Sequence, residues 1–354
     1  MKLFIRAAGN ISPQNTFGQA PLLTLPVEHA GTHLPAVEPD YKSFIDVKLI
    51  RRMSRIIKMG VAAAMECLRE AGVAVPDAVV TGTAYGCLED TGVFLSKMVE
   101  QEEELLTPTA FIQSTHNTVG AQIALMLHCN GYNNVFVHRG FSFESALQDA
   151  MMLLQEEEVK NVLVGGLDET TGISHAILSR FGLYKQKISS NLDLFKEKSK
   201  GTIAGEGAAF FLLTGETSGN NLAQLDGFFT FYKPKNIQEI QANIEEFLSK
   251  QSIATDDIDL LITGRNGDMA NDAVYDQLEK TVFNNIDSIN YKHLCGEYPT
   301  SASFALWLGA QLLSSNEMPA VLNYTGKAEK KITRILVYNH SHNTHHSLLL
   351  ISAC

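Results

Sequence analysis

A short run centred on Ser142 has the spacing of a nucleophile elbow. Gly140-Phe141-Ser142-Phe143-Glu144 approximates the GxSxG pattern, in which a serine stands on a sharp turn between a strand and a helix. Such a serine attacks acyl groups after a histidine removes its proton, so the run indicates a hydrolase or an acyltransferase. The fifth position is Glu144 rather than glycine, and the sequence assigns no histidine base. The simpler interpretation is that Ser142 caps the following helix through the free amides at its N-terminus.

The elements that must position this turn are a strand, a helix and a second strand. Val135, Phe136 and Val137 form an apolar run typical of a buried strand, and Gly140 permits a sharp turn. Apolar residues then recur at helical spacing from Ser145 onward. Residues 162–164, Val-Leu-Val, predict a second buried strand.

Four histidines near the C-terminus raise the possibility of a metal site. They are His340, His342, His345 and His346, and HxH spacing places two imidazoles on one side of a strand. The segment contains no Asp, Glu or Cys to complete a ligand set. We therefore predict no metal site here and no cofactor in the chain.

Two other features have both a chemical and a structural interpretation. Cys129 and Cys295 are alternative nucleophiles, but free cysteines are usually buried as small hydrophobic residues, which is the interpretation we favour. A basic stripe consists of Lys48, Arg51, Arg52, Arg55 and Lys58. It is either a solvated helix face or a docking surface for an acidic partner.

Composition excludes several classes of protein. The chain has 354 residues, 45% of them hydrophobic, and a formal charge of −11, which argues against nucleic acid as the main partner. It contains no apolar run near the ~20 residues that span a bilayer, and its start lacks the layout of a signal peptide. Five scattered cysteines without CxxC spacing suit a reducing compartment, so we expect a cytoplasmic protein with no membrane insertion.

Strand-like and helix-like segments alternate along the chain, which predicts an α/β fold. One helix is predicted from Ile50 to Gly72, because its apolar residues recur at three- and four-residue steps. The polar run at residues 215–221, GETSGNN, is the best boundary between two units. The second unit repeats the pattern of the first, so we predict two related halves, 1–214 and 215–354.

Several motifs in order resemble those of the β-ketoacyl synthases, enzymes with the thiolase-like fold. They are AAGNISPQNTFG, VVTGTAYGCLED, STHNTVGAQIAL, VLVGGLDE, GTIAGEGAAFFLL, GRNGDMANDAVYDQL and KHLCGEYPTSASFAL, and together they extend over the whole chain. The resemblance implies five layers, αβαβα, built from two pseudo-repeated halves, and a dimer.

The catalytic residues of that family are absent from the matching positions of this sequence. The position of the nucleophilic cysteine falls on Gly140, and the two histidine positions fall on Gly264 and Glu297. Lys292 matches the family lysine, and it is expected to form an ion pair with Glu297. A different reaction with Glu297 as general base is the alternative.

This pattern resembles the chain-length-factor subunits of aryl-polyene and type II polyketide systems, which are silent homologues that pair with an active ketosynthase. By that resemblance, Thr115, His116 and Asn117 belong to the stretch that reaches toward the partner's acyl tunnel. The gate segment of the family aligns with residues 341–344, Ser-His-Asn-Thr, next to His340, and its glycines and phenylalanine are absent. Lys48, Arg51 and Arg52 match positions that dock acyl carrier protein.

We therefore expect a non-condensing ketosynthase-like subunit that pairs with an active β-ketoacyl-acyl carrier protein synthase in fatty-acid-like polyketide or polyene biosynthesis. Its own enzymatic activity is left open. One alternative is a divergent acyltransferase or hydrolase that uses Ser142. Another is a homodimeric acyl-binding scaffold without a partner enzyme.

Overall fold

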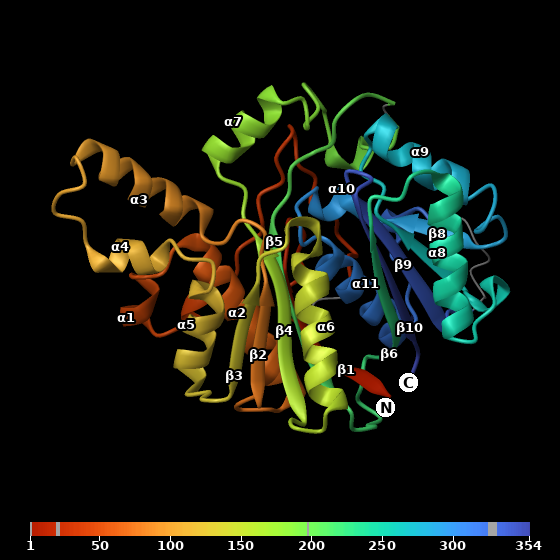
Figure 1. Cartoon of the computed structure of the whole chain (residues 1–354), viewed down its shortest axis with the longest axis horizontal. Coiled ribbons are helices and arrows are strands. Elements are labelled where there is room, and N and C mark those ends of the chain that lie inside the picture. Colours follow the sequence, from red (N-terminus) through yellow and green to blue (C-terminus); the bar gives the residue numbers. More distant parts are fainter. Residues whose placement is uncertain (1, 19–21, 197, 325–330) are drawn as a thin grey trace.

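The computed structural model describes residues 2–18, 22–196, 198–324 and 331–354, and in these residues ten strands form one mixed sheet (Figure 1). The strand order is β3-β2-β4-β5-β1-β6-β10-β9-β7-β8. The strands are β1 (Leu3–Ile11), β2 (Ala78–Gly82), β3 (Tyr132–Phe136), β4 (Asn161–Asp168), β5 (Gly207–Thr214), β6 (Ala223–Tyr232), β7 (Leu260–Thr263), β8 (Asp287–Asn290), β9 (Arg334–Ser341) and β10 (His345–Ser352). The helices are α1 (Val47–Ile50), α2 (Arg55–Ala71), α3 (Leu88–Glu100), α4 (Pro108–Gln113), α5 (Thr118–Leu127), α6 (Ser142–Gln155), α7 (Gly172–Arg180), α8 (Ile237–Lys250), α9 (Met269–Leu278), α10 (Lys292–Cys295) and α11 (Ala302–Ser315).

The sheet consists of two halves with the same topology. In the first, β5 is antiparallel to β1 and β4, while β2 runs parallel to β4 and β3. In the second, β10 is antiparallel to β6 and β9, while β7 runs parallel to β9 and β8. Within the sheet of the described residues, the halves are joined by the pairing of Leu3–Ile5 of β1 with Ala223–Leu225 of β6. This repeat confirms the predicted pseudo-repeated fold, and the run at residues 215–221 connects β5 to β6.

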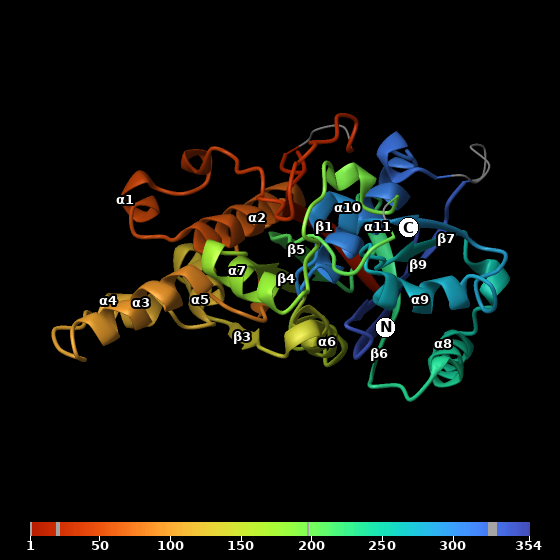
Figure 2. The ribbon, with the colours of Figure 1, turned by 90° about the horizontal axis from the view of Figure 1, so that it is seen from above.

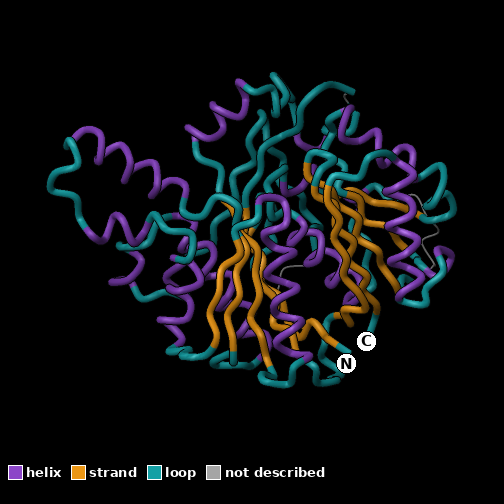
Figure 3. Tube along the Cα trace, viewed as in Figure 1, coloured by secondary structure: helices purple, strands orange, loops and turns teal. Residues whose placement is uncertain are grey.

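Helices cover both halves of the sheet in layers (Figure 3). The helices α2 and α5 pack on the outer face of the first half, and α8 and α9 on the outer face of the second. The helices α6 and α11 lie between the halves, where their apolar side chains meet those of strands from both. The result is the predicted αβαβα arrangement, with the largest apolar core in its middle layer.

The first long helix begins later than the sequence predicts. Residues 47–50 form the separate short helix α1, and α2 begins at Arg55. The break occurs because Ser54 has an extended backbone, with φ −67° and ψ 173°, so the apolar spacing from Ile50 is not continued in one helix. The predicted end is confirmed: Gly72 takes a left-handed conformation, with φ +65°, just after Ala71.

The strand β3 is not buried, contrary to the sequence prediction. It forms the edge of the sheet, where β2 is its single partner among the described strands, so its residues are exposed or half-buried. Val137 lies beyond the strand and is 49% exposed. Beside this edge, α3 and α4 extend away from the body as an arm (Figures 1 and 2).

In the described part of the chain, no helix has the length and apolarity that crossing a membrane requires.

Candidate functional site

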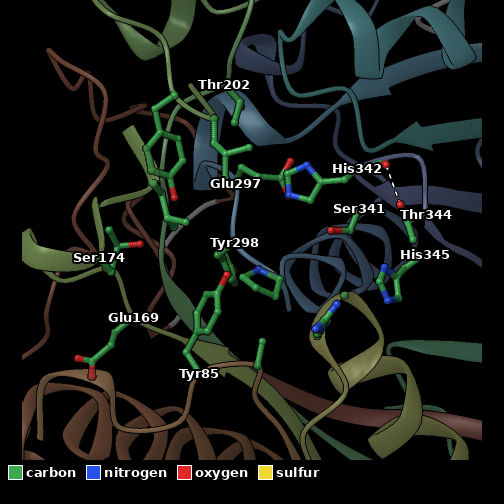
Figure 4. Close-up of a pocket in the computed structure, with 18 of the residues that line it drawn as sticks. Tyr85, Glu169, Ser174, Thr202, Glu297, Tyr298, Ser341, His342, Thr344 and His345 are labelled. Atoms are coloured by element: carbon green, nitrogen blue, oxygen red, sulfur yellow. Dashed lines mark hydrogen bonds between the residues drawn. The ribbon is translucent and has the colours of Figure 1, made fainter. Parts of the chain in front are cut away.

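A cavity of about 440 Å³ lies where the two halves of the sheet meet the β9–β10 hairpin (Figure 4). Tyr85 and Glu169 reach it from segments that follow the parallel strands β2 and β4. The carboxyl ends of parallel strands are the usual location of ligand sites in α/β proteins. Its lining also includes Arg139, Gly140, Ser174, Tyr184, Thr202, Lys233, Glu297, Tyr298, Ser341, His342, Thr344 and His345.

The turn at the start of α6 lines this cavity but has no room for a side chain at Gly140. The turn is a short 3₁₀ segment, Arg139–Phe141, in which Arg139 has a left-handed backbone with φ +52°. A Cβ atom added to Gly140 would lie 2.7 Å from the Cβ of Ser341 and 3.3 Å from that of His345. Side chains of the β9–β10 hairpin therefore occupy the space beside the turn.

The space beside Gly264 is likewise occupied by a side chain of β9. A Cβ atom there would lie 2.1 Å from Oδ1 of Asn339 and 2.7 Å from the hydroxyl oxygen of Tyr275. The Asn339 Oδ1 atom accepts a hydrogen bond from Tyr291, at 3.2 Å. Because β9 contributes both Asn339 and Ser341, one strand closes both glycine positions.

Lys292 and Glu297 form the ion pair that the sequence predicts. Nζ of Lys292 lies 2.7 Å from Oε2 of Glu297, and the lysine side chain is fully buried, while that of Glu297 is 13% exposed. The same carboxylate oxygen accepts a hydrogen bond from Nδ2 of Asn266, at 2.7 Å. With its oxygen engaged by two donors, Glu297 is a structural anion at the cavity wall.

Ser142 does not cap α6, contrary to the local interpretation of the sequence. Its hydroxyl oxygen accepts a hydrogen bond from the backbone N–H of His138, at 2.8 Å. The hydroxyl donates to the carbonyl of Arg139, at 2.9 Å, so it fastens the turn rather than the helix amides. Ser142 is fully buried, and in the described residues its hydroxyl forms no hydrogen bond with the side chain of a histidine. This arrangement does not activate the hydroxyl as a nucleophile.

Glu144, at the fifth position of the same run, points into the core. Its Oε1 accepts a hydrogen bond from the Ser347 hydroxyl, at 2.9 Å, which connects α6 to β10. Burial raises the pKa of Glu144 to about 7.

The two cysteines considered as nucleophiles, Cys129 and Cys295, offer no alternative. Both are buried, and burial raises the pKa of Cys295 well above its ordinary value.

The four C-terminal histidines point in two directions. His340 and His346 are buried, where they stack on Tyr275 and Phe231 respectively. His342 and His345 line the cavity instead. No group of three or more His, Cys, Asp or Glu side chains in the described ranges could hold a metal ion. The gate segment forms a tight hairpin turn, in which His342 and Asn343 both have left-handed backbones.

Sequence reasoning missed the acidic residues at the end of β4. Oδ1 of Asp168 accepts hydrogen bonds from Thr83 and from the amides of Ala84 and Tyr85, at 2.9–3.1 Å. Oδ2 accepts from the hydroxyl of Thr300 in the second half, at 2.9 Å. Burial nevertheless raises the pKa of Asp168 to about 6. Its position two residues after Gly166, at the carboxyl end of a strand that pairs in parallel with β2, was the available signal.

The predicted interface and docking residues are not among those that line the cavity. Thr115, His116 and Asn117 form the turn between α4 and α5, and His116 packs against Gly86. Of the basic stripe, Lys48, Arg51 and Arg52 are exposed.

The prediction that Arg55 belongs to the basic stripe is wrong. It turns inward and binds both oxygens of buried Glu206, at 2.6 and 2.7 Å, and also pairs with Glu38. It therefore belongs to the internal structure rather than to a solvated or docking surface.

Introducing a thiol at the turn is expected to destabilise the chain. Gly140→Cys should lower the free energy of unfolding by about 1–3 kcal/mol, because the new Cβ overlaps Ser341. Gly140→Cys combined with Ser341→Gly should recover most of that loss, measured by urea unfolding. Equal losses in the single and double variants would show that Ser341 does not fill this position.

Relatives of the chain share this architecture. The family model described as "Beta-ketoacyl synthase, N-terminal domain" matches residues 36–218, more than half of the chain. A search of curated protein sequences finds no significant match. Among solved structures, the ishigamide ketosynthase/chain length factor has a TM-score of 0.81 at 16% identity, covering 100% of this chain and 99% of that one.

Two further solved structures are similar over their full length. A β-ketoacyl synthase from Burkholderia phymatum STM815 has a TM-score of 0.79 at 14% identity, covering 100% of this chain and 99% of that one. A ketosynthase (ApeO) in complex with its chain length factor (ApeC) from Xenorhabdus doucetiae has a TM-score of 0.77 at 16% identity, with coverage of 100% and 98%. The strand topology, the turn before α6 and the family match together place this chain in the β-ketoacyl synthase family.

Proposed function

We propose that this chain is a non-condensing ketosynthase-like subunit of the chain-length-factor type. In this role it pairs with an active β-ketoacyl synthase in polyketide or polyene assembly. The observation that carries the proposal is the filling of the two glycine positions: Ser341 occupies the space beside Gly140, and Asn339 the space beside Gly264. A subunit packed in this way keeps the scaffold of a condensing enzyme without a place for its reactive groups.

An exposed apolar surface supports pairing with another subunit. We call it the arm surface, and it consists of Val93, Leu95, Val99, Leu105, Phe111 and Ile112. Neither α3 nor α4 has a buried residue, although α3 is 13 residues long. Helices in proteins gain most of their stability from packing an apolar face, and large exposed apolar patches mark interaction sites. A second subunit that covers the arm surface accounts for both features.

The sheet edge next to the arm fits the same partner. The strand β3 has a free edge, and Leu125, Tyr132 and Val137 beside it are all at least 40% exposed. An uncovered strand edge is a template for pairing with another chain. The edge and the arm surface lie on the same side of the molecule, so one partner can cover both (Figure 1).

The exposed basic residues border this surface. The side chain of Gln113, at the end of α4, donates a hydrogen bond to the carbonyl of Arg52. Lys48, Arg51 and Arg52 thus lie where the arm meets the body, on a chain whose formal charge is −11. A basic patch at a subunit boundary suits a strongly acidic partner such as acyl carrier protein.

Charge reversal tests that patch. Arg51→Glu/Arg52→Glu should weaken binding of acyl carrier protein to the assembled complex by about tenfold or more, with a smaller difference at high salt. Surface plasmon resonance at two salt concentrations measures both effects. Lys250→Glu, on the far side of the chain, is the matched control. Unchanged binding in the double variant would refute docking at this patch.

Co-expression with a catalytically intact β-ketoacyl synthase from the same organism tests the main proposal. We expect a 1:1 complex to co-purify and to condense acyl groups, while this chain alone remains inactive. A stable homodimer that ignores the ketosynthase would favour the acyl-binding scaffold instead. Stoichiometric labelling of Ser142 by a serine-reactive acyl probe would favour a hydrolase or an acyltransferase.

A further inference from the structure

The cavity at the turn before α6 has one basic side, which is made by three segments far apart in the sequence. His342 and His345 come from the β9–β10 hairpin, Lys233 from the residue after β6, and Arg139 from the turn itself. We call these four residues the basic edge. The backbone N–H of Lys233 donates a hydrogen bond to the carbonyl of Thr344, at 2.8 Å, which holds the end of β6 against the hairpin.

The two cations of the basic edge form no salt bridge with the described residues. Arg139 and Lys233 are both exposed at the cavity, and neither pairs with a carboxylate in those ranges. The Lys233 ammonium lies over the ring of Tyr232 instead, 5.1 Å from its centroid. Cations gathered at a cavity attract ligands of negative charge, here on a chain whose own formal charge is −11.

Three residues of the basic edge also have an unusual backbone. Arg139, Lys233 and His342 are left-handed, with φ of +52°, +48° and +52°. This conformation is unfavourable for residues other than glycine, and the residues that adopt it gather at sites that hold ligands. The chain therefore carries long or aromatic basic side chains at positions where its backbone would favour glycine.

The fourth member, His345, is held between two aromatic rings. Its imidazole packs edge-on against Phe141 and Tyr232, with centroids 4.7 and 5.0 Å apart. Burial lowers the pKa of His345, and the neighbouring basic groups, which include Arg139 and Lys233, lower it further. A neutral imidazole still donates one N–H, so an anion at the basic edge gains this donor in addition to the two cations.

The two acidic residues of the lining leave the hairpin side basic. The charge of Glu297 is offset by Lys292, whose Nζ lies 2.7 Å from its Oε2. Burial raises the pKa of Glu169 to about 7, so this carboxyl is partly protonated near neutral pH. Figure 4 shows Glu169 across the cavity from His345. A second anionic group on a ligand would approach these carboxyls, so a ligand with one negative charge fits best.

The rest of the lining supplies apolar surface for the body of a ligand. Leu178 of α7 and Leu183, which follows that helix, contribute aliphatic side chains, and Tyr85, Tyr184 and Tyr298 contribute aromatic rings. The cavity of about 440 Å³ is typical of sites for small organic molecules, in which apolar walls surround a few polar groups.

We propose that this cavity binds a small monocarboxylate with an apolar body. The planar fork of the Arg139 guanidinium matches the two oxygens of a carboxylate, and the Lys233 ammonium and the His345 imidazole donate to the same group. The body of the ligand packs against Leu178, Leu183 and the tyrosine rings. All of these residues belong to one chain, so the proposal does not rest on pairing with a ketosynthase.

The test uses 4-phenylbutyrate as the probe and the whole isolated chain at pH 7, with affinity measured by calorimetry and protein NMR. The neutral analogue 4-phenylbutyramide has the same shape and should bind at least about tenfold more weakly, because it lacks the charge that the basic edge attracts. Arg139→Gln and Lys233→Gln should each weaken binding of the probe about tenfold. Lys250→Gln, which removes an exposed cation on α8, should leave it unchanged.

Four results would overturn the proposal. They are the absence of probe binding, equal affinity for the amide, affinity retained in both Arg139→Gln and Lys233→Gln, and displacement of the probe by equimolar inorganic phosphate. Arg139 and Lys233 are exposed, so both variants should keep the melting temperature of the unmodified chain, and either one suffices as a test if the other fails to fold. Because the isolated chain is used, a failure to pair with a ketosynthase cannot produce any of these results.

Discussion

Glu297→Leu is expected to lower the free energy of unfolding by about 3–5 kcal/mol, because it leaves the Lys292 ammonium buried without its partner. The lysine side chain is fully buried, and Glu297 is the anion with which it forms an ion pair. Lys292→Met should have a smaller effect. The remaining carboxylate keeps its hydrogen bond to Asn266 and reaches the cavity, where water can solvate it.

The double variant Lys292→Met/Glu297→Leu separates lost charge pairing from lost packing. If the penalty comes from an uncompensated charge, the double variant should be more stable than Glu297→Leu alone, measured by urea unfolding. Glu246→Leu is the matched control, since it breaks an exposed pair with Lys250 and should change stability by less than about 0.5 kcal/mol. A double variant as unstable as the sum of the singles would contradict the ion-pair explanation.

Local sequence signals predicted the elements of this fold well. The apolar spacing of α2 and the glycine after it placed that helix, and its end at Gly72 is confirmed. The alternation of strands and helices predicted an α/β fold, and the resemblance to the β-ketoacyl synthases implied the repeated αβαβα arrangement that the structure confirms. The pairing of Lys292 with Glu297 could also be predicted, because the resemblance placed both residues at the same site.

Contacts between distant segments could not be predicted in this way. Ser341 lies beside Gly140, about two hundred residues earlier in the chain, and Asn339 beside Gly264. Which side chain fills a glycine position depends on how two elements pack, and no spacing rule specifies that. The sequence placed Arg55 in a surface stripe, because it does not reveal that the fold brings Glu206 next to it. The strand β3 was predicted to be buried because its apolar residues do not reveal that its outer edge is left unpaired by the other described strands.

Charges placed on the arm surface are expected to abolish pairing with the ketosynthase. Leu95 and Ile112 are 50% and 61% exposed, so neither side chain contributes much to the core of the isolated chain. In a complex that covers the arm, Leu95→Asp/Ile112→Asp would bury two unpaired carboxylates against apolar surface. Burying an unpaired charge is strongly unfavourable, and a loss of about 100-fold or more in affinity follows.

Matched controls distinguish an interface from a general defect. Met269, on α9 at the opposite end of the molecule, is 57% exposed, so Met269→Asp introduces one carboxylate at an exposed apolar position away from the arm (Figure 1). It should co-purify with the ketosynthase as the unmodified chain does, while the arm variant elutes alone with an unchanged melting temperature. If the arm variant still co-purifies with the ketosynthase, the interface does not involve α3 and α4. The outer edge of β3, which no other strand in the described ranges pairs with, would then be the surface to alter next.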